Sequence, residues 1–130
     1  MAAVVPNTGE KELLDRAIKQ IEGSKLKLYA NDYTATNGSS VGNVTECAVS
    51  GYAAITLAAG TWTVSTSAAI TTANYAQQTF SLTTAGSAYG YYVTNSAGTI
   101  LLWAERFTGA PYVLPAGGGS ILVTVNLTGD

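Results

Sequence analysis

Glu46 and Glu105 are the acidic residues of this sequence that best fit catalytic chemistry, because each lies within a segment of strand-like composition. A glycoside hydrolase needs two carboxyl groups about 5 to 10 Å apart, and neighbouring strands of a sheet can hold side chains at that separation. Nothing near either glutamate indicates an aromatic sugar-binding cleft. We therefore expect Glu105 to make a structural hydrogen bond or an intersubunit ion pair, and we keep the glycan-cleaving pair as an alternative.

Other catalytic and metal-binding schemes lack their essential residues. The chain contains no histidine and a single cysteine, Cys47. Without imidazole there is no common base to activate the many serines and threonines, and one thiol cannot complete a four-ligand zinc site. The apolar neighbours of Cys47 predict a buried thiol. We therefore expect a protein that is not an enzyme, with no catalytic residue, no metal and no cofactor.

Charge is confined to one region of the sequence. The chain has six basic and eight acidic residues, a net charge of −2, and nine of these charged residues lie between Glu10 and Lys27. Its basic cluster, Lys19, Lys25 and Lys27, is small. A nucleic-acid surface needs clustered Lys and Arg, and a membrane span needs about 20 apolar residues. We expect neither nucleic acid nor membrane as a partner.

The charged region predicts one amphipathic helix at about residues 8–22. Asn7 fits an N-cap with an acidic residue three positions later. An apolar stripe at three-to-four-residue spacing predicts packing on the chain's own sheet, with docking on a neighbouring subunit as the alternative. Acidic and basic residues four positions apart predict ion pairs on the solvent side. The stripe is Leu13, Leu14, Ala17, Ile18 and Ile21, and the expected pairs are Glu12 with Arg16 and Asp15 with Lys19.

The rest of the chain, about residues 25–128, predicts a β body within one domain, residues 1–130. The apolar period changes to two, and short segments rich in Thr, Val, Ile and aromatic residues follow, separated by glycine. The lack of a further helical pattern favours antiparallel pairing. We predict a mainly β fold, an antiparallel β-sandwich or jelly-roll-like barrel with one N-terminal amphipathic α-helix. The expected strands are 25–29, 44–49, 52–57, 61–65, 75–82, 89–94, 100–107 and 121–127.

Two hairpins and one long loop are expected between these strands. The first hairpin has its turn at 95–98, where Gly98 can adopt a positive φ. The second joins Phe107 to Ile121 through a proline- and glycine-rich connection. Residues 31–43 are rich in turn formers and predict an exposed loop.

The scarcity of charge on the β body predicts assembly with other subunits. Monomers commonly protect their sheet edges with charged residues, so we expect some of these edges to be covered, most simply by copies of the chain. Three tyrosines around Gly90 are candidates for a contact patch, but we favour the interpretation that they are spread over the two faces of the sheet. Glu105 and Arg106 should point to opposite faces. The predicted interface residues are Leu13, Leu14, Ile18, Tyr89, Tyr91, Tyr92, Glu105 and Arg106.

Six short stretches, spread along the chain from residue 4 to residue 107, resemble one group of proteins. They are 4–14, 26–29, 51–54, 75–80, 89–93 and 101–107. In these stretches the sequence is similar to small structural proteins encoded by tailed bacteriophages. The resemblance implies a virion component and carries over no catalytic residue.

Within a virion, composition favours the exterior of the head. Proteins that meet DNA tend to be basic, whereas a short acidic β domain looks like a head decoration, or cement, protein. We expect it to stabilise the shell through contacts with the major capsid protein and copies of itself, as a homotrimer by analogy with cement proteins, and to bind no small molecule. No secretory leader is recognisable, so synthesis in the host cytoplasm is expected. The alternative is a tail or neck component, an adaptor or a receptor- or glycan-binding module that uses residues 31–43 and the tyrosines.

Overall fold

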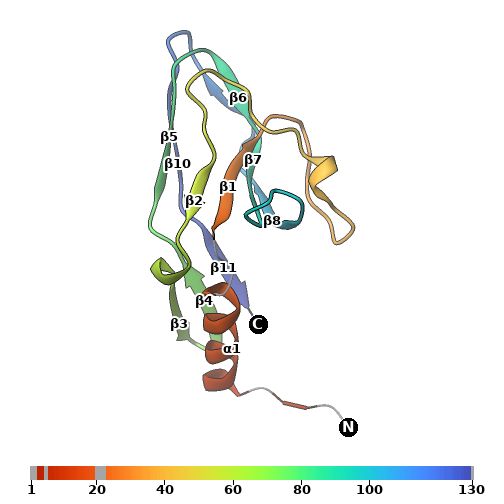
Figure 1. Ribbon diagram of the computed structural model, residues 1–130, viewed down its shortest axis with the longest axis vertical. Coiled ribbons are helices and arrows are strands. Elements are labelled where there is room, and N and C mark those ends of the chain that lie inside the picture. Colours follow the sequence, from red (N-terminus) through yellow and green to blue (C-terminus); the bar gives the residue numbers. More distant parts are fainter. Residues whose placement is uncertain (1–2, 5, 20–22, 130) are drawn as a thin grey trace.

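The computed structural model describes residues 3–4, 6–19 and 23–129. The protein is mainly β, with open antiparallel sheets in a sandwich-like arrangement and one N-terminal helix, α1 (Asn7–Lys19), which confirms the predicted fold class. The strands are β1 (Ser24–Tyr29), β2 (Ile55–Leu57), β3 (Thr63–Ser67), β4 (Ile70–Asn74), β5 (Gln78–Leu82), β6 (Gly86–Ala88), β7 (Gly90–Thr94), β8 (Leu101–Arg106), β9 (Tyr112–Leu114), β10 (Gly119–Val123) and β11 (Asn126–Gly129), with short 3₁₀ turns η1 (Val41–Asn43) and η2 (Ala59–Thr61). Figure 1 shows an elongated molecule in which α1, β3, β4 and β11 lie at one end.

Among the described residues the strands form one four-stranded sheet, one three-stranded sheet and two strand pairs, and the three-stranded sheet continues one of these pairs into a long ribbon. The sheet has the order β2-β1-β7-β8, and each neighbouring pair is antiparallel. The ribbon consists of β5 with β10 and then β4 with β11, while β3 pairs with the other side of β4. The backbone N–H of Tyr75 donates to Val125 O at 3.1 Å between the two halves of the ribbon. Strand β6 pairs with β9.

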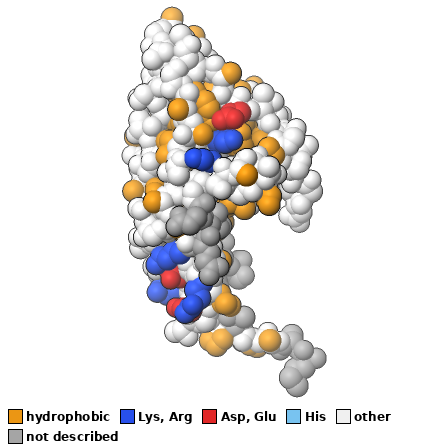
Figure 2. Space-filling model, viewed as in Figure 1, with side chains coloured by type: hydrophobic (Ala, Val, Ile, Leu, Met, Phe, Trp, Pro, Cys, Tyr) orange, Lys and Arg blue, Asp and Glu red, His pale blue; other side chains and the backbone are white. Residues whose placement is uncertain are grey.

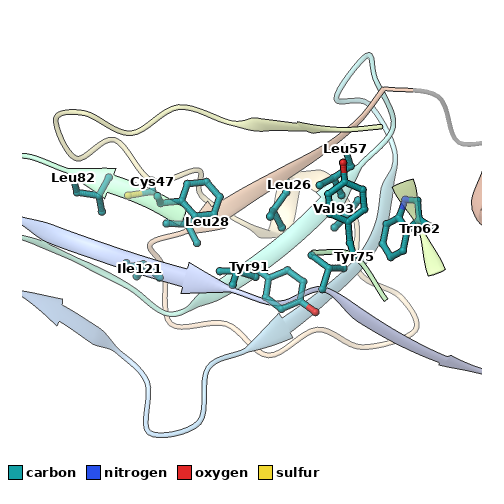
Figure 3. Close-up of a cluster of buried hydrophobic side chains, with 14 of the residues drawn as sticks. Leu26, Leu28, Cys47, Leu57, Trp62, Tyr75, Leu82, Tyr91, Val93 and Ile121 are labelled. Carbon is teal, nitrogen blue, oxygen red and sulfur yellow. The ribbon is translucent and has the colours of Figure 1, made fainter. Parts of the chain in front are cut away.

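The main hydrophobic core lies between the four-stranded sheet and the ribbon. Leu26 and Leu28 of β1 alternate with lysines and are fully buried, in one cluster with Phe80 of β5 and Ile121 of β10. Figure 3 shows Leu26, Leu28 and Ile121 between the strands. Cys47 is 3% exposed in the same core, which confirms the predicted buried thiol. Each fully buried Leu, Ile or Phe side chain contributes about 1.5–3 kcal/mol to the free energy of unfolding. This core is therefore the main source of stability.

Helix α1 packs on β3 and β4 of its own chain, which confirms the interpretation that we preferred. Ile18 is 2% exposed within the main core, and Leu14 is half-buried against it. Leu13 is 61% exposed and Ala17 is also exposed, so the apolar stripe that reaches the core is narrower than predicted. Residues 20–22, with the expected end of the helix and the last residue of the stripe, lie outside the described residues.

Two ion pairs on the solvent side of α1 are confirmed. Arg16 Nε lies 2.7 Å from Glu12 Oε1, and Lys19 Nζ lies 2.8 Å from Asp15 Oδ1. Pairs of this exposed i,i+4 type stabilise a helix by about 0.3–0.5 kcal/mol each.

The hairpin between β7 and β8 is also confirmed. Gly98 has a φ of +74°, as its place in the turn requires. The side chain of Asn95 holds the turn, because its Oδ1 accepts from the N–H of Thr99 at 2.8 Å and from the N–H of Ile100 at 3.1 Å.

The second predicted hairpin is wrong, because an extra strand, β9, forms between Phe107 and Ile121. Strand β9 pairs with β6 and β10 pairs with β5, so β8 and β10 are not neighbours. The sequence pattern also misses β4 and β6, which are short and rich in Ala, Gly, Ser and Thr. Residues 44–49, predicted as a strand, make only an isolated bridge between Tyr29 and Glu46.

The turn between β3 and β4 contains strained backbone. Ala68 and Ala69 have φ values of 51° and 65°, a left-handed region that costs an L-residue about 1–2 kcal/mol. Glycine avoids this cost but loses about 0.5–1 kcal/mol more entropy on folding. We predict that Ala69→Gly raises the free energy of unfolding by about 0.5–1 kcal/mol in a denaturant titration. Ala97→Gly, at an exposed turn position without positive φ, should lower it; equal responses of the two variants would contradict the strain.

Candidate functional site

Strand β7 lies in the middle of the four-stranded sheet and is buried along its whole length. Tyr91 is 3% exposed and packs in the main core. Tyr92 is 2% exposed and packs on the opposite face with Tyr29 and Val44. The favoured interpretation, that the tyrosines are spread over two faces, is therefore confirmed. Tyr91 and Tyr92 contribute to two cores and not to a surface patch, because β1 and β8 flank β7 and both of its faces are covered.

Loop 31–43 covers the outer face of this sheet, beside β1 and β8 in Figure 1. Tyr33 is half-buried against the cluster of buried tyrosines, and Tyr29 Oη donates to Tyr33 O at 3.0 Å. Asn31 closes the loop, since its Nδ2 donates to Asn43 O at 2.9 Å. The predicted exposed loop is thus exposed only in part. The apolar rings beneath it explain the difference, because they need a cover that a freely exposed loop would not give.

Arg106 ties this loop to the edge of the sheet. Its Nη1 lies 2.5 Å from Asp32 Oδ1 and 3.4 Å from Tyr33 O, and its guanidinium carbon lies 5.3 Å from the centre of the Tyr89 ring. The Asp32 side chain is 70% exposed, so the ion pair contributes about 1 kcal/mol or less. Arg106 and Tyr89, both predicted as interface residues, are therefore engaged within the chain.

Glu105 lies on the opposite face of β8 from the arginine, as strand alternation predicts. Tyr91 Oη donates to Glu105 Oε2 at 2.9 Å, which is the structural hydrogen bond expected for this carboxylate. In the same way, Tyr52 Oη donates to Glu46 Oε2 at 2.8 Å, and Lys27 Nζ lies 3.6 Å from Glu46 Oε1. Each glutamate thus belongs to its own small polar group.

The register of the strands keeps Glu46 and Glu105 apart. Glu46 is opposite Tyr29 of β1, which is opposite Gly90 of β7. Gly90 is in turn opposite Arg106 of β8, the neighbour of Glu105. Because adjacent strands are about 4.8 Å apart, the backbones at the two glutamates are about 14 Å apart. The carboxylate pair considered from the sequence is therefore not assembled in this fold.

Burial raises the pKa of Tyr52, Tyr91 and Tyr92. For Tyr52 and Tyr91 burial is the largest cause and the hydrogen bond to a glutamate is the next. Burial, with a smaller contribution from the charge of Glu46, raises the pKa of Tyr92 to about 12. All three hydroxyls therefore stay protonated at neutral pH, and the first two act as donors to carboxylates.

Of the apolar residues predicted to lie at an interface, Leu13 is exposed. Three other exposed apolar side chains were not predicted as interface residues. Leu122 is 55% exposed, Val113 is 68% exposed and Ile100 is 57% exposed. The sequence signal for Leu122 is the run of three apolar residues in β10, because strand alternation buries the outer two and turns the middle one to solvent. Val113 precedes the buried Leu114 in β9, but its other neighbour, Tyr112, is also exposed, so alternation alone does not select it.

Charged side chains gather on α1 and in one small group on the body, as Figure 2 shows for one face. Between Glu46 and Glu105 the sequence contains no Lys, Arg, Asp or Glu. The exposed side chains of residues 47–104 are therefore hydroxyl, amide or apolar groups. We call the part of the molecular surface that they form the neutral surface.

No protein-family model, curated protein or solved structure matches this chain. Within residues 3–4, 6–19 and 23–129, no group of three or more His, Cys, Asp or Glu residues is placed to hold a metal ion. No helix in the part of the chain that the structure describes has the length and apolar character to cross a membrane.

Gly90 is a position of close packing between β7, β8 and the ring of Tyr29. A Cβ atom there would overlap Glu105 O and the ring of Tyr29. We predict that Gly90→Ala lowers the free energy of unfolding by about 1–3 kcal/mol, the usual cost of overpacking, in a denaturant titration. Gly38→Ala is the matched control, because nothing lies within 4 Å of its added Cβ and its φ is not in the left-handed region. A loss of stability in the control as large as that in Gly90→Ala would contradict the close packing.

The raised pKa of Tyr92 predicts a loss of stability at alkaline pH. A tyrosine with an ordinary pKa of about 10 when unfolded and about 12 when folded holds its proton more tightly in the native state. Its contribution is complete below pH 10 and is lost as the pH rises toward 12. We predict that Tyr92→Phe reduces the decline in unfolding free energy between pH 9 and pH 12 by about 1–2 kcal/mol. Parallel pH curves for the two proteins would contradict this assignment.

Proposed function

We propose that this protein is a structural component of a tailed-bacteriophage virion and acts as a capsid decoration (cement) protein. In this role it binds the outside of the head shell, in contact with the major capsid protein and with copies of itself. Many weak contacts of this kind add up across the shell and oppose its expansion by packaged DNA. The observation that carries the proposal is the neutral surface, because residues 47–104 offer contact groups without Lys, Arg, Asp or Glu.

The basic residues support a position away from DNA. Arg16, Lys19, Lys27 and Arg106 each lie within 4.0 Å of a carboxylate of the same chain. A DNA-binding surface needs basic side chains that are free to replace counterions at phosphates. The net charge of −2 adds repulsion from the phosphate backbone. These features favour the exterior of the head over its DNA-filled interior.

The neutral surface suits contacts that depend on shape and on backbone hydrogen bonds. Charged residues are depleted at the centre of protein interfaces, where close packing excludes water. Residues 47–104 have this composition, and several sheet edges are open among the described residues. A chain repeated many times on a shell would gain attachment strength from such contacts without any charged binding site.

The location and copy number of the chain in purified phage particles test this proposal. We expect on the order of hundreds of copies on the head exterior by cryo-electron microscopy, in line with the symmetry of a shell. Particles that lack the chain should release their DNA at a lower temperature. About six or twelve copies in the tail or neck would overturn the proposal in favour of an adaptor or a receptor- or glycan-binding module.

Two single-residue variants test which surface of the chain binds the capsid. Leu13 is the exposed member of the predicted helix contacts, so Leu13→Asp should weaken rebinding to capsids stripped of the chain by about tenfold or more. Asn37→Asp adds the same charge at an exposed position of loop 31–43 and should leave rebinding unchanged. If Asn37→Asp instead abolishes adsorption to host cells while Leu13→Asp has no effect, the tail alternative replaces the head proposal.

A further inference from the structure

Strand β3 is the outer strand of the sheet β11-β4-β3. It pairs with β4 along its whole length, from Thr63 opposite Asn74 to Ser67 opposite Ile70. Among the described residues no strand pairs with its other edge, which faces away from β4 in Figure 1. This edge therefore carries backbone N–H and C=O groups without a strand partner.

The free edge of β3 lacks the features that protect another edge of the same molecule. Strand β8 ends with Glu105 and Arg106, and its register with β7 shifts between Val93 and Thr94. Charges and irregular pairing of this kind discourage the addition of another strand. Strand β3 has no charged residue, no proline and no shift of register. It is therefore, unlike the edge of β8, open to a further strand.

Three neighbours hold β3 in position. Strand β4 pairs with it, α1 packs on both strands, and the two-residue turn at Ala68 and Ala69 closes the hairpin. Val64 packs against the main core, and Thr66 Oγ1 lies 3.0 Å from Thr71 Oγ1 of β4. A strand fixed in this way loses little conformational freedom when it acquires a partner.

The orientation of the backbone groups follows from the hairpin. In antiparallel pairs, hydrogen-bonded and non-hydrogen-bonded positions alternate, and the residues that flank a two-residue turn form a hydrogen-bonded pair. Ser67, Ser65 and Thr63 therefore bond to β4. The backbone N–H and C=O groups of Val64 and Thr66 face the free edge.

We propose that this edge pairs with β3 of a second copy of the chain, antiparallel and about a two-fold axis at Ser65. Ser65 then lies opposite its own counterpart, and Val64 lies opposite Thr66 of the second copy. The backbone groups of these two residues donate and accept across the contact. The two three-stranded sheets become one six-stranded sheet.

A second copy fits this edge because the contact is self-complementary. A two-fold contact brings the same strand from each subunit together, so any charge near its centre would meet a like charge, and β3 carries none. The side chains that meet are Thr, Ser and Val, which form favourable cross-strand pairs. The free backbone groups of Val64 match those of Thr66 in number and direction.

This inference goes beyond the proposed function, because it concerns the protein free of any particle and names the surface used for self-contact. The two-fold axis of an antiparallel pair is perpendicular to the sheet, so both copies of α1 lie on one face of the joined sheet. A dimer of this kind differs from the trimer expected by analogy with cement proteins.

Analytical ultracentrifugation of the full chain, from about 1 μM to about 1 mM, tests the pairing. We expect a dimer. Ser65→Lys and Ser65→Glu, which each place like charges opposite one another, should raise the dimer dissociation constant by about five- to tenfold or more. An equimolar mixture of the two variants should restore the dimer, because opposite charges then meet. Ser81→Lys, the same change at an exposed position of β5, should leave the dissociation constant unchanged.

A natural chain that stays monomeric throughout this range would overturn the inference. So would a dimer or trimer that both Ser65 variants form as readily as the natural chain, because self-contact would then use another surface. Failure of the mixed variants to re-associate would exclude the register centred on Ser65. None of these outcomes depends on the position of the chain in a particle, which cryo-electron microscopy measures separately.

Discussion

The burial of β7 on both faces is the constraint on which the rest of this structure depends. A strand buried on both sides needs a cover over each face, which the ribbon supplies on one side and loop 31–43 on the other. A loop that covers apolar rings must satisfy its own backbone polar groups. The hydrogen bonds of Asn31 to backbone groups and that of Arg106 to Tyr33 O help to meet this requirement, and Arg106 also pairs with the side chain of Asp32. The glycine at the start of β7 leaves room for the ring of Tyr29.

The few charged groups of the body serve this internal arrangement. Arg106 holds the covering loop, and Glu46 and Glu105 accept hydrogen bonds from tyrosines that contribute to the main core. The remaining charges lie mostly on α1, where they form pairs. Apart from this small group of charges, the outside of the β body presents hydroxyl, amide and apolar groups. Contacts made by such a surface depend on fit and on backbone pairing, so they are less sensitive to salt than contacts between charges.

Patterns over a few neighbouring residues were sufficient to predict one helix, one strand and one hairpin. The period of 3.6 predicted α1, the alternation of leucines with lysines predicted β1, and the turn containing Gly98 predicted the β7–β8 hairpin. The alternation of side chains along a strand also predicted that Glu105 and Arg106 lie on opposite faces of β8. Pattern reasoning failed for β4, β6 and β9, because these short strands are held by their partners and not by their own apolar content. The predicted hairpin between Phe107 and Ile121 was wrong for the same reason, because β9 lies between β8 and β10 in the chain and the two strands are not neighbours.

The sequence by itself determined the class of fold, the buried thiol and the scarcity of charge, because composition and periodicity follow directly from the order of residues. Only the tertiary structure decided that Tyr91 and Tyr92 are buried, that Ile18 faces the core while Leu13 faces solvent, and that the two glutamates lie apart. The physical reason is that periodicity shows which side chains share a face. It does not show whether another part of the chain covers that face, and this depends on contacts between residues far apart in sequence.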